Sequence, residues 1–443
     1  MRWKLVILLT AGLMAAPLRA EMDDLKLDYH GAGWLQTGRV EESFALPNDG
    51  NAYNKNWVGQ SGGLLTVHAT INEHWDGALG IGTVLVQLAR GARLLSNKWY
   101  PFWVSWVDEA RISHTSSLFT GDDELKLTFG SFHYGYNPDV KNLGQYLLHG
   151  YVYPGALESG FTGPLGVFQA ISGAQASYKI GGFKNDLNLQ VETEEKPLYD
   201  LSVSDIVTWR LHPALEIGAG VNFYRLLPAN MKATNPGDDC DPNQLGPYAN
   251  AAEDNPCFIV IRKDSTNDSI LEKVNPSLQG TKLMGRFHFD PKALFSSGDD
   301  GVLGGDDLVL YGEVGLIGVK DYPRFYDKIG RRIPAMIGFN LPGFRFLNWS
   351  IEAEYYASKI SSDNIAARNG SPIPIKDDVL NSKRDDWKWS LNASKVFAGH
   401  AILMGQVAND HLRLGGNHDT DTGIEALRTP SDWYWTTKIA YFF

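Results

Sequence analysis

Charged side chains at alternate positions are the feature of this sequence best suited to chemistry. Successive side chains of an extended strand point to opposite faces, so charges two residues apart share one face. If such strands enclosed water, rings of these charges would set an ion preference. The residues expected to line that space are Glu109, Arg111, Glu192, Arg210, Glu216, Lys282, Arg286, Glu352, Glu354 and Lys438. Both signs occur, which indicates weak selectivity, and pairs such as Glu109 with Arg111 can equally neutralise each other.

Tyrosines in the polar segment 134–164 form a second group of residues that could bind a ligand. They are Tyr134, Tyr136, Tyr146, Tyr151 and Tyr153. A tyrosine combines a flat apolar ring with a polar hydroxyl, and such rings could stack on the faces of sugars. Long connections are often functional but need not be, so an ordinary surface loop is an equal alternative.

The chain has two cysteines, Cys240 and Cys257, which lie in one polar segment rich in Asn, Asp, Pro and Gly. In an oxidising compartment they would form a disulfide. Closing a loop of that length contributes on the order of 3 kcal/mol in the chain-entropy model. Neither cysteine has a neighbouring cysteine or histidine at metal-ligand spacing, so we expect no metal site there.

Catalytic and metal-binding motifs have little support. The runs 409–411 and 418–419 bring Asp and His together, but adjacent strand residues point to opposite faces and no nucleophile motif accompanies them. The acidic stretch 296–308 fails the spacing of a calcium-binding EF-hand and suits a solvated turn. We therefore predict a protein that is not an enzyme and that carries no metal or cofactor.

The N-terminus has the pattern of a secretion signal. Two basic residues precede an apolar stretch from Leu5 to Leu18, and Ala20 is a small residue suited to cleavage. We expect residues 1–20 to be a signal peptide that is removed on export, and residues 21–443 to form a single domain. Export removes three basic residues, so the formal charge of −11 becomes more negative and nucleic acid is not an expected partner.

Alternation with a period of two marks the elements that must position these residues. Apolar and polar residues alternate along 186–194, 348–358 and 386–397, where Lys395 interrupts the apolar side. Beyond the signal no run of about 18 apolar residues occurs, so helical membrane spans are excluded. A membrane protein without such spans must be a barrel, because only helices and closed barrels satisfy every backbone hydrogen bond in hydrocarbon.

We predict an all-β protein, a transmembrane antiparallel β-barrel of about 16 strands, with 18 as the alternative. The predicted strands are residues 25–38, 62–73, 77–90, 104–115, 124–133, 165–180, 183–194, 200–211, 214–227, 278–290, 306–319, 333–341, 346–358, 385–397, 400–413 and 432–443. Tight turns such as Gly181-Gly182 alternate with long segments such as 228–277, which is typical of short periplasmic turns and long outer loops. Aromatic residues gather near the strand ends, where girdles at membrane interfaces are expected.

The last predicted strand ends the chain on an aromatic residue. Trp435, Thr437, Ile439, Tyr441 and Phe443 share one face of it. This resembles the terminal strand of Gram-negative outer-membrane proteins, which the barrel assembly machinery reads. The resemblance implies that Tyr441 and Phe443 act as an assembly signal. In architecture the whole chain after the signal is similar to the porins, although no motif identifies a subfamily.

The resemblance to porins implies further properties. In porins the third outer loop folds inward and narrows the pore, so the segment 134–164 would form the constriction. An outer-membrane location, contact with lipid and lipopolysaccharide, and assembly as a homotrimer would follow. The implied function is passive diffusion of small hydrophilic solutes, with sugars among the candidates. A non-channel barrel for adhesion or structure is the alternative, and an outer-membrane hydrolase is a more remote one.

Overall fold

The computed structural model of the protein describes residues 25–42, 54–88, 102–119, 122–148, 169–193, 198–231, 258–263, 269–274, 279–295, 303–319, 329–344, 346–355, 387–409 and 431–443. Within these ranges extended strands predominate, and helix is confined to short turns. No helix in the described part of the chain is long and apolar enough to span a membrane.

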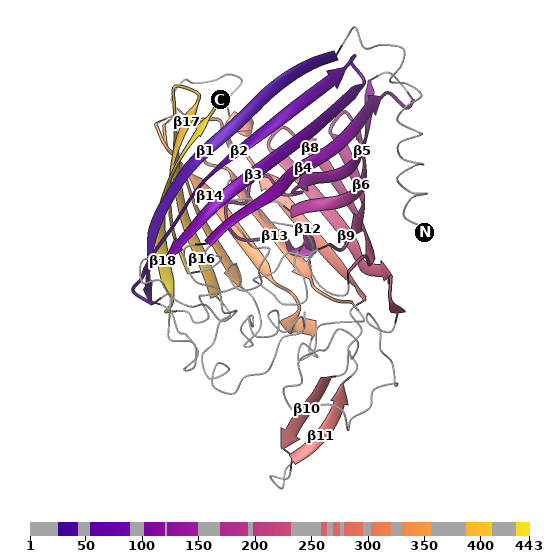
Figure 1. Ribbon diagram of the computed structural model, residues 1–443, viewed down its shortest axis with the longest axis vertical. Helices are drawn as coiled ribbons and strands as arrows, with labels where there is room; N and C mark the ends of the chain where they lie inside the picture. The colour runs from indigo at the N-terminus through magenta and orange to yellow at the C-terminus, as the bar shows by residue number, and fades with distance from the viewer. Residues whose placement is uncertain are drawn as a thin grey trace.

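Sixteen of the described strands form one closed antiparallel barrel (Figure 1). In chain order they are β1 (Leu25–Glu42), β2 (Trp57–Ile71), β3 (Trp75–Leu88), β4 (Phe102–Ser116), β5 (Asp123–Tyr134), β6 (Gln169–Ile180), β7 (Phe183–Val191), β8 (Leu201–His212), β9 (Leu215–Leu227), β12 (Gly280–Phe289), β13 (Leu310–Leu316), β14 (Ala335–Leu341), β15 (Asn348–Tyr355), β16 (Trp387–Phe397), β17 (Ala401–Ala408) and β18 (Trp433–Phe442). The predicted all-β barrel and its 16 strands are confirmed, each predicted strand overlapping one of these with shifts at its ends.

Pairing between the first and last strands closes the barrel. Each barrel strand pairs with its neighbours in the chain, β9 pairs with β12, and β1 pairs with both β2 and β18. Thr37 of β1, for example, faces Thr437 of β18 across the seam. Closure leaves the ring without a free edge, so the backbone groups of the wall find partners in the neighbouring strands.

The predicted tight turns join strands at one end of the barrel, the end that also holds the C-terminus. Asn72 begins the turn between β2 and β3 with a φ of 56°, and its side-chain oxygen accepts a hydrogen bond from the backbone N–H of His74. Gly181 takes the left-handed conformation between β6 and β7, and Gly399 does so between β16 and β17. Residues that tolerate positive φ, or that bond to their own turn, thus fix the registers of these hairpins.

The two faces of the wall have opposite chemistry. On β15, Trp349 and Ile351 point outward and are 36% and 48% exposed, whereas Ser350 and Glu352 point inward and are buried. The same alternation runs through the other strands and leaves many large apolar side chains on the outside. A water-soluble fold would bury these side chains, so the outer surface is suited to hydrocarbon.

The interior is not uniformly polar, which the alternation alone does not predict. Trp34 and Trp106 point inward and belong to a buried apolar cluster on one side of the lumen. Each indole lies over a glycine of a neighbouring strand, Trp34 over Gly62 and Trp106 over Gly82, where an added Cβ would lie 2.4 Å and 2.3 Å from the ring. The bare backbone at these glycines allows the large side chains to lie flat against the wall.

Two local features depart from the predicted pattern. A hairpin of β10 (Phe258–Lys263) and β11 (Ser269–Val274) occurs in the segment 228–277, where only a loop was expected, and it forms a sheet separate from the barrel. The register between β3 and β4 shifts by one residue: Gly80 pairs with Glu109 and the next residue, Ile81, pairs with Val107, so Asp108 is the extra residue of a β-bulge. This bulge turns the adjacent carboxylates Asp108 and Glu109 to the same inner side, which strict alternation forbids.

Lys395 interrupts the outer apolar face of β16, as the sequence indicates. Its ammonium group lies 3.3 Å from the ring centre of Phe346 and 5.5 Å from that of Phe397. Two aromatic faces therefore hold the charge near the turn end of the strand, in a cation–π arrangement.

Candidate functional site

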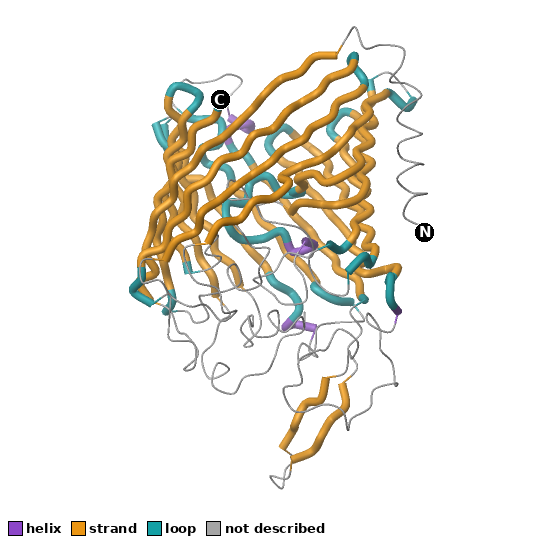
Figure 2. The backbone as a smooth tube through the Cα atoms, viewed as in Figure 1, coloured by secondary structure: helices purple, strands orange, loops and turns teal. Residues whose placement is uncertain are grey.

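A segment that follows β5 enters the barrel. This inner segment, residues 135–148, contacts inward side chains of β9, β12, β13 and β15 and ends in the 3₁₀ helix η2 (Tyr146–Leu148). Figure 2 shows it as teal loop and a purple turn inside the orange wall. Because β5 and β15 lie on opposite sides of the ring, the inner segment crosses the lumen.

Glu313 of β13 is the first anchor of the inner segment. Its side chain is buried and accepts four hydrogen bonds, at 2.5 Å from the Tyr136 hydroxyl, 3.0 Å from Asn137 Nδ2, 3.1 Å from the Gln145 N–H and 2.8 Å from the Tyr146 N–H. An ionised carboxylate offers about four acceptor positions, so both of its oxygens are engaged by the inner segment.

Glu352 of β15 is the second anchor. It accepts bonds from the backbone N–H groups of Lys141 at 2.5 Å, Asn142 at 2.9 Å and Leu143 at 3.1 Å. The hydroxyl of Tyr311 on β13 donates a further bond at 3.0 Å. Hydrogen bonds to a charged acceptor are stronger than neutral ones, and these bonds engage three successive backbone N–H groups of the inner segment.

Apolar packing and two further bonds complete the attachment. Leu143, Tyr146 and Leu147 of the inner segment are fully buried. Tyr146 lies against Gly315 of β13, where an added Cβ would come within 2.8 Å of the tyrosine side chain. His288 pairs with Asp139 of the inner segment at 2.9 Å, and Asn222 Nδ2 donates to the Leu147 carbonyl at 2.9 Å. The inner segment is therefore docked on the wall.

Several of the charged residues predicted to line the lumen occur as ion pairs. Arg286 lies 2.7 Å from Glu216, and Arg111 lies 3.0 Å from Glu109 on the same strand. Arg111 also contacts Asp76 of β3. These pairs face inward, and the charge of each member is largely offset by its partner.

The remaining charged candidates occupy different places. Glu192 follows β7 and pairs with buried Arg225 at 3.6 Å, while Arg210 is 64% exposed at the turn end. Glu354 stands opposite Lys388 in the register of β15 and β16. Lys282 lies 4.8 Å from the ring of Tyr224, and Lys438 lines the cavity described next.

A cavity of about 250 Å³ lies between the inner segment and the wall formed by β14–β18 and β1. Its lining residues are Gln36, Val140, Lys141, Asn142, Asp306, Asp307, Asn340, Leu341, Asn348, Trp349, Ser350, Asn392, Ala393, Ser394, Met404, Gly405, Gln406, Thr436 and Lys438. Nine of these nineteen residues have amide or hydroxyl side chains, which makes them the largest group. Lys141 and Asn142, whose backbone is bonded to Glu352, border the cavity from the side of the inner segment.

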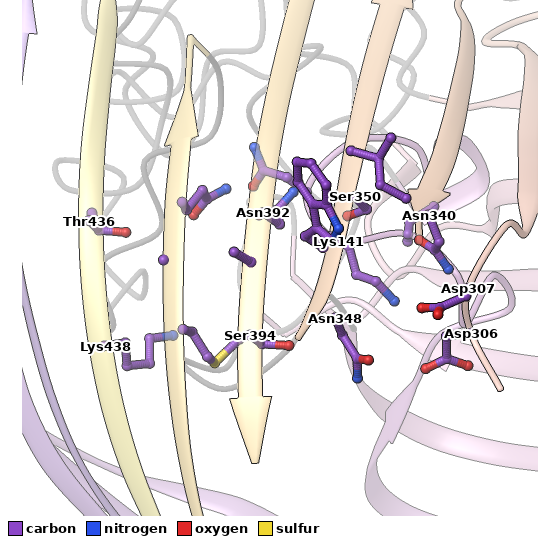
Figure 3. Close-up of a pocket in the computed structure, with 18 of the residues that line it drawn as sticks. Lys141, Asp306, Asp307, Asn340, Asn348, Ser350, Asn392, Ser394, Thr436 and Lys438 are labelled. Atoms are coloured by element: carbon purple, nitrogen blue, oxygen red, sulfur yellow. The ribbon is translucent and has the colours of Figure 1, made fainter. Parts of the chain in front are cut away.

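Strand register aligns five of these side chains in one row. Asn340 pairs with Ser350, Ser350 with Asn392, Asn392 with Gln406, and Gln406 with Thr436. This neutral row crosses β14 to β18 at one level, as Figure 3 shows for its labelled members. The next row toward the turn end contains Asn348, Ser394 and Lys438, and the two aspartates lie beside it.

Asp307 ties two turns together at the border of the cavity. Its carboxylate accepts hydrogen bonds from the backbone N–H groups of Gly304 at 2.8 Å, Gly343 at 3.1 Å and Phe344 at 3.0 Å. Burial alone would raise the pKa of Asp307, but these three donors and the nearby charge of Lys292 outweigh it and hold the pKa below its ordinary value of 3.8. The aspartate is thus ionised and engaged with protein groups.

Some sequence-based expectations fall on parts of the chain that the structure does not describe. Tyr151, Tyr153, Cys240 and Cys257 lie outside the described residues, as do the signal peptide and the Asp–His runs at 410–411 and 418–419. Among the described tyrosines, Tyr134 ends β5 and donates to Asp186 at 3.2 Å, while Tyr136 and Tyr146 belong to the inner segment. In the described ranges no group of three or more His, Cys, Asp or Glu is arranged to hold a metal ion.

The C-terminal residue lies against β1 on the outer surface of the barrel. Phe443 exchanges two backbone hydrogen bonds with Gly31 of β1 and lies over that glycine, whose added Cβ would be 2.2 Å from the ring. Tyr441 stacks on Phe443 with ring centres 6.5 Å apart. Both aromatics are more than half exposed, which leaves them available to lipid or to another protein.

Sequence reasoning selected neither Glu313 nor any of the five members of the neutral row as a site residue. Glu313 alternates with the apolar residues Val314 and Leu316, but the strand has only seven residues. The alternation therefore indicates an inward position for Glu313 only weakly. The row is invisible in sequence because its members come from five strands. Ser350 and Asn392 are polar members of the alternating segments 348–358 and 386–397, but nothing in the sequence aligns them with Gln406.

Comparisons with known proteins give a likeness in structure and none in sequence. No protein-family model matches the chain, and no curated protein matches it. Solved porin structures match it along almost its whole length. A double mutant of the porin of Rh. blastica is 9% identical, with 95% of this chain and 100% of the porin covered at a TM-score of 0.41. A triple mutant of the Rhodopseudomonas blastica porin is 8% identical, with 95% and 100% covered at a TM-score of 0.39.

Proposed function

We propose that this protein is an outer-membrane channel through which small hydrophilic solutes, sugars among them, diffuse passively. The observation that carries the proposal is the inner segment docked across a closed barrel whose outside is apolar. A polar path inside an apolar cylinder is what a membrane pore requires. Glu313 and Glu352 restrain the inner segment within the lumen, and a cavity of about 250 Å³ lies between this segment and the wall.

The proposed location fits the chemistry of the outer surface. Apolar side chains cover the wall, and Trp57 with Trp435 forms an aromatic pair, 5.5 Å apart, near the end of the barrel opposite the short turns. Aromatic rings favour the interface between lipid and water. We further propose that residues 1–20 direct export, and that exposed Tyr441 and Phe443 are read by the barrel assembly machinery. We propose that the outer surface contacts lipid and lipopolysaccharide, and that the protein assembles as a homotrimer.

Planar-bilayer recording of the full-length purified protein tests this function. The proposal predicts stable, ohmic conductance steps in potassium chloride, with the conductance reduced when sugars are added. Folding is verified independently by circular dichroism and by the shift in gel mobility on heating. A correctly folded barrel that inserts but stays silent would favour an adhesive or structural role and overturn the proposal.

A further inference from the structure

We propose that the cavity between the inner segment and β14–β18 is a selectivity site for uncharged, polyhydroxylated solutes of monosaccharide size. The inference rests on the proposed channel function and assigns the neutral row, Asn340, Ser350, Asn392, Gln406 and Thr436, as the residues that select the solute.

The composition of the row is the first argument. Amide side chains each carry two N–H donors and a carbonyl acceptor, and hydroxyls donate and accept as well. A sugar presents hydroxyls that also do both, so successive hydroxyls can exchange bonds with neighbouring members of the row. An ion that enters the row must give up part of its hydration shell, and no member of the row carries a formal charge to offset that loss.

The state of the nearby acids is the second argument. Glu352 is fully engaged by three backbone N–H groups and Tyr311. Asp307 is engaged by three turn amides. Both carboxylates therefore face protein donors, and a cation entering the cavity would have to compete with those bonds. Asp306 and Lys141 are exposed, so water screens their charges. Lys438 also lines the cavity, but it lies in the next row toward the turn end and not in the neutral row.

An unsatisfied acceptor is the third argument. Asn340 is 7% exposed, and its Oδ1 has no hydrogen-bond partner among the described residues. A buried acceptor in that state costs free energy that a donor from a solute would recover. Asn340 lies at the β14 end of the row, so a solute bonded to it would also reach Ser350, its neighbour in register.

Size is the fourth argument. The cavity of 250 Å³ falls below the range of about 300–1,000 Å³ that is common for drug-sized ligands. Lys141 and Asn142 close it on the side of the inner segment, and their backbone is held by Glu352. A single sugar ring suits this space better than an oligosaccharide lying flat.

Vesicle swelling with the full-length protein tests the inference. Glucose, gluconate and glucosamine have similar size and differ in charge, so their rates isolate selection by charge. We expect glucose to enter about fivefold faster than either charged analogue, which corresponds to about 1 kcal/mol. Gln406→Glu places a carboxylate in the row and should abolish the preference over glucosamine. Gln175→Glu makes the same change on β6, away from the cavity, where Gln175 Nε2 donates a 2.9 Å hydrogen bond to Asn188. This variant should retain the preference.

The outcomes separate the inference from the channel proposal. A channel that conducts but passes gluconate or glucosamine as fast as glucose would refute the neutral selectivity site while leaving the channel intact. Equal loss of preference in both variants would remove the role of the row. A folded protein that neither conducts nor swells vesicles would overturn the channel proposal and this inference with it.

Discussion

At the residue scale, two buried glutamates hold the inner segment against the wall of the barrel. Glu313 and Glu352 lie on strands that β14 separates, and each gathers several donors from a different stretch of the inner segment. A carboxylate is suited to this role because it accepts from several N–H groups at once, which a neutral side chain of the same shape does not match.

Glu352→Gln should loosen the inner segment. The amide retains one acceptor oxygen and turns an N–H₂ group toward backbone donors, so buried donors lose partners at a cost of about 1–3 kcal/mol. We expect a lower midpoint of urea unfolding and larger current fluctuations in single-channel records. Glu109→Gln is the control, because Glu109 contacts Arg111 and not the inner segment. Identical records for the two variants would contradict this role of Glu352.

The lowered pKa of Asp307 predicts how the stability of the protein depends on pH. Its pKa is lowered in the folded protein, so its contribution is present above the ordinary aspartate value and is lost as pH falls through the lower folded value. Asp307→Asn should therefore unfold at lower urea concentration than the parent at pH 7, and the gap should shrink once the pH falls below 3.8. A gap that widens on acidification would be inconsistent with this assignment.

At the scale of elements, the inner segment fits the wall through glycine. Gly315 on β13 lies under Tyr146, whereas Gly285 on the adjacent β12 faces outward with its nearest contact at 3.6 Å. The two positions are neighbours in the same sheet and differ in what a side chain would meet. They provide a matched pair for testing whether the docking of the inner segment controls the width of the path.

Gly315→Leu should displace the inner segment and change the single-channel conductance. Overpacking of this kind costs about 1–3 kcal/mol, and Tyr146 is the group that must move. Gly285→Leu adds the same atoms on the outer face and should leave the conductance unchanged. If the conductance of both variants equals that of the parent, the inner segment does not border the conducting path.

Deleting residues 138–147 and joining the ends with a short Gly-Ser linker removes the inner segment more completely. We expect the single-channel conductance to rise, because the strands of the barrel remain paired without it. The deletion variant is compared in the same bilayers after its folding has been verified by heat-dependent gel mobility. An unchanged conductance would place the segment outside the path.

At the scale of the whole molecule, the period of two predicted the fold, because one face of each strand must suit hydrocarbon and the other must suit the interior. Gly181 marked a turn for a local reason, and the structure has that turn. The β10–β11 hairpin, the bulge at Asp108 and the inward tryptophans arise from pairing or packing that no local pattern records. The neutral row depends on strand register, so its members become a set only once the barrel is closed.

Labelling of introduced thiols shows whether current flows along the neutral row. In a protein with Cys240 and Cys257 replaced by serine, Gln406→Cys places a thiol on the inner face of β17, and Val407→Cys places one on the outer face. Single-channel conductance is recorded before and after a bulky thiol-specific reagent is added. We expect a stepwise fall for Gln406→Cys and no change for Val407→Cys. An unchanged conductance in Gln406→Cys channels that mass spectrometry shows to be labelled would contradict this expectation.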